Sequence, residues 1–168
     1  AHFVLSYVHL VCEHNFELAK SEAKRSLELN PYYNNPMGQL GLVLNYEGNA
    51  GEGITLCKKS IDADPRSPGN PRWMQHLSLG HFVLEQYDLS AKWAERSDQQ
   101  APDSPRTLLL QTSAMGNMGQ LAEANVTAEK IRTLCPDFAI SKIERWPFKD
   151  ESIWEQLIAG LKKAELPA

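Results

Sequence analysis

The segment GQLGLVLNYEGNAGEGITLCKKSIDADP, residues 38–65, contains two apolar runs separated by a glycine-rich turn, and it ends on a proline. Its last three residues, Ala63-Asp64-Pro65, have counterparts at three other places in the chain. These counterparts are Leu29-Asn30-Pro31, Gln100-Ala101-Pro102 and Leu134-Cys135-Pro136. Successive prolines are 34, 37 and 34 residues apart, so the segment is one unit of an internal repeat. The longer interval contains a Pro/Gly-rich loop, residues 67–71, which accounts for the extra length.

Each unit is expected to contain two helices. In residues 16–27, apolar and small side chains recur at helical spacing, and charged side chains occupy the other faces. Small residues at the middle of each second helix let a neighbouring helix approach closely: Ala19 and Ala23, Gly53 and Cys57, Ser90 and Ala94, Ala124 and Ala128. The closing proline ends that helix, because it lacks an N–H and clashes with the preceding turn. No segment alternates like a strand, so we predict an all-α fold of at least eight helices in antiparallel pairs.

The unit at residues 38–65 resembles one tetratricopeptide repeat (TPR). The matching residues are Leu40-Gly41, Leu44, the turn glycine Gly48, Gly53, Cys57, Ser60 and Pro65. The chain departs from the family at Phe3, Met37, Met74 and Leu108, where a Trp is usual, and at Ser78 and Thr112, where a Gly is usual. The resemblance covers about residues 1–136 and implies a TPR superhelix, an α-solenoid, of four helix pairs. These pairs would occupy about residues 1–33, 34–67, 68–103 and 104–136.

The remaining residues, 137–168, are not another full repeat. A short helix is expected within residues 137–145, and Asp150 is a plausible N-cap for a helix that runs to about Ala164. This last helix is amphipathic, as a helix that caps the end of the array must be. Its expected buried stripe is Ile153, Trp154, Leu157, Ile158 and Leu161, and its expected wet face is Glu151, Glu155, Gln156, Lys162 and Lys163.

The C-terminal sequence resembles the end of certain bacterial signalling proteins. The resemblance lies in Arg145-Trp146-Pro147-Phe148-Lys149-Asp150 and in the tail at residues 157–167. In those proteins the repeats follow a class III adenylate cyclase domain or a winged-helix DNA-binding domain, which implies a missing domain upstream of Ala1. Two alternatives stay open: an autonomous assembly scaffold, or the docking domain of an enzyme whose catalytic part is absent here.

Composition excludes several partners and compartments. A net charge of −4 lacks the basic excess that nucleic acid or an anionic membrane surface would require. No run reaches the roughly 18 apolar residues that cross a bilayer. The three cysteines are odd in number and widely spaced, which indicates a reducing compartment and a cytoplasmic location.

Catalytic and metal-binding patterns are weak. His9, Cys12 and His14 are close in sequence, but His14 lies at or beyond the predicted turn, and His76 and His81 miss the i, i+4 spacing of helical metal pairs. There is no nucleophile elbow, and the glycines at residues 48–53 lack the Lys-Ser/Thr of a phosphate-binding loop. We therefore expect no enzyme activity, no metal and no cofactor.

The concave face of the predicted superhelix, lined by the first helix of each pair, is the expected binding groove for a protein or peptide. The polar residues expected there are Asn35, Gln39, Asn45, Tyr46, Arg72, Gln75, His76, Arg106, Ser113 and Asn117. A merely solvated face is the alternative. The family's carboxylate clamp, which binds the C-terminus of a peptide, is not matched, because Val4, Val8, Gly38, Leu42 and Gln75 occupy the corresponding sites.

The first helix, residues 3–11, is apolar around nearly its whole circumference. Such a pattern is typical of a helix with neighbours on both sides. We expect an upstream repeat to cover this face in the native protein, and the isolated chain to self-associate as a two-fold dimer. The residues expected in that contact are Phe3, Val4, Tyr7, Val8 and Val11.

Overall fold

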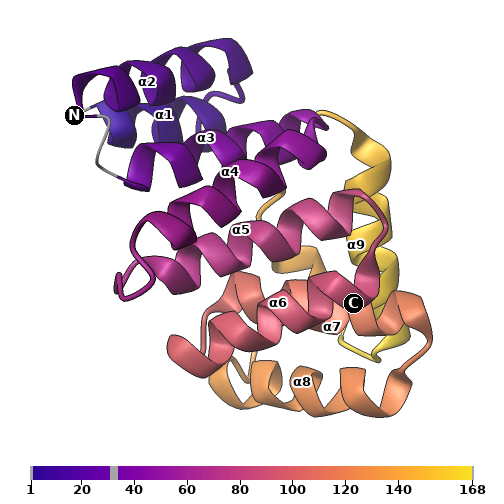
Figure 1. Ribbon diagram of the computed structural model, residues 1–168. Helices are drawn as coiled ribbons and strands as arrows, with labels where there is room; N and C mark the ends of the chain where they lie inside the picture. The colour runs from indigo at the N-terminus through magenta and orange to yellow at the C-terminus, as the bar shows by residue number, and fades with distance from the viewer. Residues whose placement is uncertain (1, 31–33, 168) are drawn as a thin grey trace.

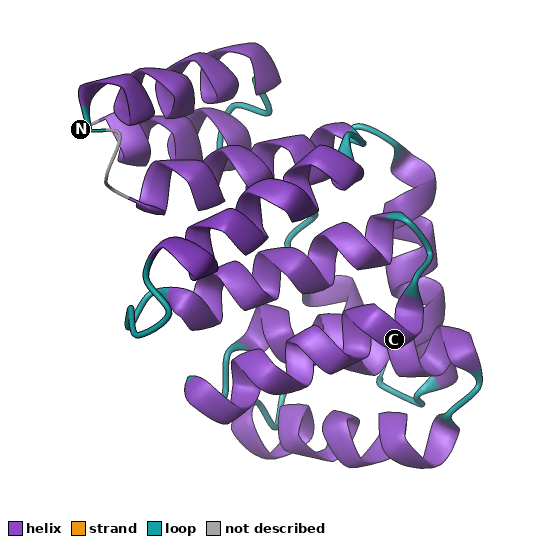
Figure 2. Ribbon diagram, viewed as in Figure 1, coloured by secondary structure: helices purple, strands orange, loops and turns teal. Residues whose placement is uncertain are grey.

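The computed structural model describes residues 2–30 and 34–167, and within them the chain is helical with no strand (Figure 2). The helices are α1 (His2–Val11), α2 (Phe16–Leu29), α3 (Asn34–Glu47), α4 (Ala50–Ala63), α5 (Asn70–Val83), α6 (Tyr87–Gln100), α7 (Pro105–Met118), α8 (Leu121–Leu134), the 3-10 turn η1 (Ile140–Lys142) and α9 (Glu151–Lys163). The predicted all-α fold is confirmed. Pro31, which closes the first repeat in the sequence, lies outside the described residues, as do Ala1 and Ala168.

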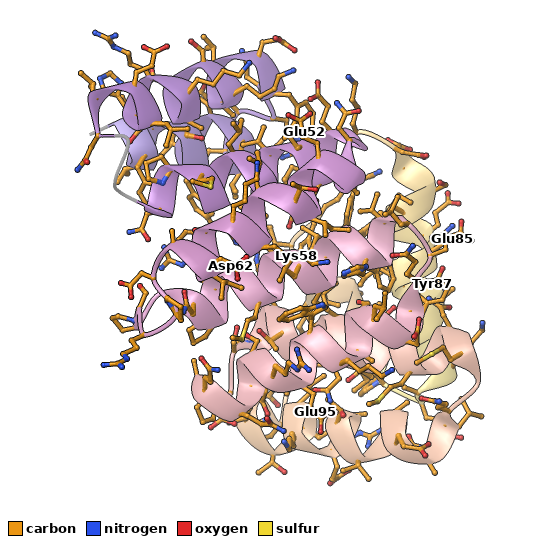
Figure 3. The ribbon with its side chains drawn as sticks, viewed as in Figure 1. Glu52, Lys58, Asp62, Glu85, Tyr87 and Glu95 are labelled. Atoms are coloured by element: carbon orange, nitrogen blue, oxygen red, sulfur yellow. The ribbon has the colours of Figure 1, made fainter. Side chains whose placement is uncertain are left out.

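Helices α1 to α8 stack in sequence order as antiparallel neighbours (Figure 1). The first helices of the pairs, α1, α3, α5 and α7, also contact one another in turn, so they line one face of the array. The second helices form the opposite, outer face, where charged side chains such as Glu52, Lys58 and Asp62 of α4 point away from the array (Figure 3). The predicted solenoid is therefore present.

The turn within each pair repeats the same backbone conformation. His14, Gly48, Glu85 and Gly119 have φ of 52°, 101°, 57° and 75°, in the left-handed region that favours glycine. These residues are 34, 37 and 34 positions apart, which is the spacing of the prolines in the sequence. The turn glycine inferred at Gly48 is confirmed, and two of the four turns adopt the same conformation without glycine.

Small residues allow the helices of a pair to approach closely. A Cβ atom on Gly41 of α3 would lie 2.6 Å from the Sγ of Cys57 and 2.8 Å from the carbonyl oxygen of Gly53, both on α4. The small residues predicted at the middle of each second helix are all buried: Ala19, Ala23, Gly53, Cys57, Ser90, Ala94, Ala124 and Ala128. Side-chain size along the repeat thus sets the spacing of the array.

The C-terminal helix differs from the expected cap. Asp150 is its N-cap, as predicted, because its carboxylate accepts the Ser152 N–H at 2.9 Å. However, α9 does not stack beyond α8 as an end cap would. It packs mainly against α7 and runs crosswise to the stacked helices (Figure 1). Gly116 of α7 and Gly160 of α9 meet so closely that a Cβ atom on either would clash with the backbone of the other helix.

The segment that leads to α9 also differs from expectation. The short helix expected within residues 137–145 is only the three-residue turn η1. Along α9 itself, Ile153, Leu157 and Leu161 are buried as predicted, whereas Trp154 and Ile158 are half-buried. Among the described residues, no helix is both long and apolar enough to span a bilayer.

Candidate functional site

The concave face formed by α1, α3, α5 and α7 has two different halves. In the half nearer the C-terminus, residues 145–149 cross the face and reach α3. The Lys149 N–H donates to the Tyr46 carbonyl at 2.9 Å, and the Phe148 and Tyr46 rings meet edge-on, with centroids 5.0 Å apart. The Lys149 ammonium also lies 3.5 Å from the Glu47 carboxylate, which Lys20 of α2 contacts at 2.9 Å. The chain therefore covers part of its own groove.

Helix α9 covers the rest of this half. The Ser113 hydroxyl donates to the Leu157 carbonyl at 2.8 Å, and the Asn117 amide donates to the Gln156 carbonyl at 3.0 Å. Ser113 and Asn117 were predicted to line an open groove. They lie on the concave face, but the prediction that they are available to a partner is wrong, because α9 occupies that position.

The Gln156 side chain ties the same helix to the α5–α6 turn. Its carbonyl accepts the Tyr87 hydroxyl at 3.2 Å, and its NH2 donates to the Glu85 carboxylate at 3.1 Å. Glu85 and Tyr87 accordingly lie at the edge of the array next to α9 (Figure 3). Residues 145–163 cover the part of the concave face that runs from α7 to the C-terminal end of α3. We call this covered part the filled half.

The other half of the concave face contains a cavity of about 370 Å³, which we call the inner pocket. Its lining residues come from all four first helices and from the C-terminal segment. They are Phe3, Val4, Tyr7, Gln39, Leu42, Tyr46, Arg72, Gln75, His76, Leu79, Arg106, Leu110 and Trp146. Six of the ten predicted groove residues are thus brought together: Gln39, Tyr46, Arg72, Gln75, His76 and Arg106.

The two arginines of the inner pocket have no carboxylate partner within the described part of the chain, and no aspartate or glutamate lines the pocket. Arg106 is half-buried. Its guanidinium donates to the Tyr46 hydroxyl at 3.1 Å and lies 5.1 Å from the Trp146 ring centroid. Arg72 is exposed, with its guanidinium 6.0 Å from the Trp73 ring centroid. Two fixed positive charges therefore face a largely apolar cavity.

Two buried titratable residues of the pocket, His76 and Tyr46, are neutral at physiological pH. Burial lowers the pKa of His76 to about 3; a hydrogen bond to the Gly38 carbonyl opposes this shift, and the charges of Arg72 and Arg106 add to it. Burial likewise raises the pKa of Tyr46 to about 12, against the opposing charge of Arg106. Neither His76 nor Tyr46 therefore adds to the charge of the two arginines.

A second cavity of about 430 Å³, the outer pocket, shares Arg72 and Gln75 with the inner pocket. Asn35 lies here and not in the inner pocket. The Gln75 amide donates to the hydroxyls of Ser104 at 3.0 Å and Thr107 at 2.8 Å. Trp73 also lines this cavity, and its buried indole N–H has no acceptor among the described residues.

Five of the predicted groove residues are buried and not exposed: Gln39, Asn45, Tyr46, His76 and Ser113. Asn45 is 0% exposed and lies on the face of α3 that packs against α4 and α5, where its amide donates to the His76 carbonyl at 2.7 Å. Its placement in the groove is wrong, because Asn45 faces away from the inner pocket. Tyr46 does line the pocket but is only 2% exposed, since Phe148 and Arg106 cover its ring and hydroxyl.

Trp146 was not predicted as a groove residue, and Phe3 and Tyr7 were assigned only to self-association, whereas Val4 was assigned both to self-association and to a position of the carboxylate clamp. The signal for Phe3 and Tyr7 is their position on a first helix, whose inner side must line the same face as α3 and α5. Nothing in the local pattern around Pro147 indicates that Trp146 crosses the array. No cluster of three or more potential metal ligands occurs in residues 2–30 and 34–167.

No protein-family model matches the chain, and no curated protein sequence does. Solved structures do. A mutant O-GlcNAc transferase from Thermobaculum terrenum aligns with a TM-score of 0.69 and 16% identity over 79% of this chain, which spans only 25% of the transferase. MamA of AMB-1 aligns with a TM-score of 0.67 and 16% identity over 98% of this chain and 92% of its own. YrrB, a TPR protein with an unusual peptide-binding site, gives 0.62 and 16% over 97% and 82%. At such identities the likeness shows the fold, a TPR solenoid.

Proposed function

We propose that this chain is a protein–protein interaction module that holds a peptide segment of its partner in the inner pocket. The observation that supports this most is the pocket itself, an open cavity that the first helices of four successive pairs line together. Its apolar wall, with a few amide and guanidinium groups, is typical of sites that bind a flexible ligand and fix its orientation. The peptide-binding site of YrrB is a further reason, by analogy of fold, to expect a peptide here.

The shape of the open surface favours an extended segment. The inner and outer pockets meet at Arg72 and Gln75, so a ligand that enters one can continue into the other. A helix or extended chain spans such a surface, whereas the filled half offers no comparable space beside α7. We therefore place the partner over α1, α3, α5 and the first turns of α7, where Arg106 and Leu110 line the inner pocket.

A random peptide display library tests this proposal without a known partner. Peptides selected on the whole chain would be resynthesised with a photoreactive benzophenone group, and their cross-links mapped by mass spectrometry. We expect cross-links to Phe3, Tyr7 and residues near Arg72. Cross-links confined to the outer helices α2, α4, α6 and α8 would contradict the proposal.

A matched pair of charge reversals strengthens the test. Arg72→Glu alters the inner pocket, and Arg96→Glu alters the outer surface of α6, where the Arg96 guanidinium also lies over a tryptophan, 4.9 Å from the Trp93 ring centroid. Both side chains are exposed, so neither change should cost more than about 0.5 kcal/mol of stability. Binding should fall for Arg72→Glu alone.

We also propose self-association through α1. Val4 is 59% exposed and Tyr7 is 42% exposed, and both are large side chains on the outermost helix. Val8 and Val11 are half-buried, and Val11 packs against the core, so it contributes less than the sequence pattern indicates. Light scattering should give a dimer for the chain and a monomer for the Val4→Glu, Val8→Glu double variant. A monomeric wild-type chain at high concentration would contradict this proposal.

The wider context is proposed from sequence alone. The resemblance of residues 145–150 and 157–167 supports a regulatory module of a cytoplasmic bacterial signalling protein that carries an adenylate cyclase or winged-helix domain. An autonomous scaffold and the docking domain of an enzyme remain the alternatives. The sequence of the full-length gene product decides among the three, because only one of them places a cyclase or winged-helix domain before the repeats.

A further inference from the structure

The inner pocket is a cationic site on an acidic protein. The whole chain carries a net charge of −4, yet the pocket lining contains Arg72 and Arg106 and no acidic residue. Elsewhere in the described chain, Lys20, Lys130 and Arg145 have carboxylate partners within 2.8 to 3.1 Å. Arg72 and Arg106 have no such partner among the described residues, and what sets them apart from unpaired surface cations is that they line one cavity together. This arrangement favours an anionic ligand.

Arg106 is also held in position before any ligand arrives. The Tyr46 hydroxyl accepts a hydrogen bond from one N–H of Arg106, and the guanidinium lies over the face of the Trp146 ring. A guanidinium has five N–H donors, so most remain available for a planar, two-oxygen acceptor such as a carboxylate. Preorganisation of this kind lowers the entropic cost of binding.

The residues around the two guanidinium groups indicate which chemical group should carry the anion. Phe3, Tyr7, Leu42, Leu79 and Leu110 form an apolar wall beside the guanidinium groups. A strongly hydrated, highly charged group such as phosphate would leave this wall unused, whereas a carboxylate on a short hydrocarbon stem, next to an apolar residue, contacts both surfaces. Aspartate and glutamate side chains have this chemistry.

The outer pocket indicates that the ligand chain continues past the charge. It shares Arg72 and Gln75 with the inner pocket, and its further lining residues Ser104 and Thr107 carry hydroxyl groups. A peptide that fills both pockets carries its carboxylate within the chain and not at its C-terminus.

We infer that the inner pocket binds an aspartate or glutamate side chain of the partner, with its carboxylate between Arg72 and Arg106 and an apolar neighbour against α1 and α3. This inference rests on the proposed peptide-binding function and specifies its ligand. The site differs from a clamp for a terminal carboxylate in the residues that hold the anion, because Val4, Leu42 and Gln75 occupy clamp positions in this pocket and the charges come from Arg72 and Arg106.

The test uses three libraries of acetylated nonapeptides offered together to the immobilised chain. The first has a central Glu and an amidated end, the second a central Gln and an amidated end, and the third a central Gln and a free C-terminus. All other positions are drawn from uncharged residues. Mass spectrometry measures the enrichment of each library. We expect the Glu library to be enriched about tenfold over the second at low salt, and less at high salt, as screening requires.

Variants assign the effect to the pocket. Arg72→Gln should reduce the preference for Glu to less than about threefold, while Arg96→Gln should retain it. Arg106→Lys keeps the charge but loses the fork of N–H donors, so the preference should weaken in this variant too. If Arg106→Lys unfolds, the exposed Arg72 still carries the test, because its replacement removes no packed side chain.

Each other outcome has a definite meaning. Equal enrichment of the Glu and Gln libraries, with cross-links still in the inner pocket, would overturn the acidic side chain but leave the peptide-binding function in place. Enrichment of the free C-terminus library alone would overturn it in favour of a terminal carboxylate. Failure of every library to bind, together with display selection that yields no pocket-directed peptide, would overturn both the inference and the proposed function.

Discussion

The two halves of the concave face show that one repeat surface can either be covered by the chain's own C-terminal segment or be left open. At α7, the hydroxyl of Ser113 and the amide of Asn117 bond to backbone carbonyls of α9. At α5, Arg72 and Gln75 occupy the same kind of position, on the inner side of a first helix, and line open cavities. The difference does not lie in the repeat itself. It arises because the chain turns back after α8 and covers only one part of the concave face.

The largest expected difference between the halves is in the effect of truncating a side chain. Leu157 of α9 is 0% exposed against α7, so Leu157→Ala should lower the free energy of unfolding by about 2–5 kcal/mol. Val4 lines the inner pocket and is 59% exposed, so Val4→Ala should change the free energy of unfolding by no more than about 0.5 kcal/mol. Urea unfolding of both variants measures this. Similar small losses would mean that α9 is not part of the core.

A second pair of substitutions probes how closely α9 approaches α7. A Cβ atom on Gly160 would clash with the carbonyl oxygen and hydroxyl of Ser113, so Gly160→Ala should destabilise the fold by about 1–3 kcal/mol.

The control is Gly51 of α4, where an added Cβ meets nothing within 4 Å. Because alanine is the better helix former, Gly51→Ala should stabilise the protein by about 0.5–1 kcal/mol. Thermal unfolding measures both the expected loss of stability in Gly160→Ala and the expected gain in Gly51→Ala. A stabilising Gly160→Ala would show that the two helices are farther apart than described.

A smaller effect concerns the pH dependence of folding stability and involves His76 of the inner pocket. Burial, with the charges of Arg72 and Arg106, lowers the pKa of His76 to about 3 from an ordinary value of 6.5. Protonation therefore opposes folding: the contribution of His76 is fully present above pH 6.5 and is lost as the pH falls from there towards 3.

Urea midpoints between about pH 7.5 and 5 should fall less steeply in His76→Gln, whose amide can still donate to the Gly38 carbonyl. The slope that remains includes His81, because burial lowers its pKa as well. An identical slope in the variant and the wild type would show that His76 does not couple to folding.

The repeat could be predicted from sequence because its signals are local. A proline that ends a helix, as at Pro65, or small residues at Ala19 and Ala23, act through neighbours a turn away or in the adjacent helix. The side of α3 that Asn45 faces could not be fixed, because an asparagine on a first helix suits both the groove and a buried hydrogen bond. The return of Trp146 across the array depends on contacts with α3 that are far away in sequence, and periodicity carries no information about them.

The same reasoning applies to the candidate site. Arg72, Gln75 and Arg106 were identified because first helices must line the concave face of a solenoid. Their availability, in contrast to Ser113 and Asn117, depends on where α9 lies. A residue's position in the repeat therefore predicts which face it occupies, and only the tertiary structure shows whether that face is open.

Hydrogen exchange of the Lys149 amide tests most directly whether the chain fills half of its own groove. This residue lies outside any helix, and its N–H donates to the Tyr46 carbonyl at 2.9 Å. Nearby Glu144 is exposed, and its N–H donates to no backbone carbonyl among the described residues. NMR-detected exchange should show Lys149 protected almost as strongly as the core helices, with Glu144 exchanging fast. Equally fast exchange of both amides would contradict the account, because residues 145–149 would then not lie against α3.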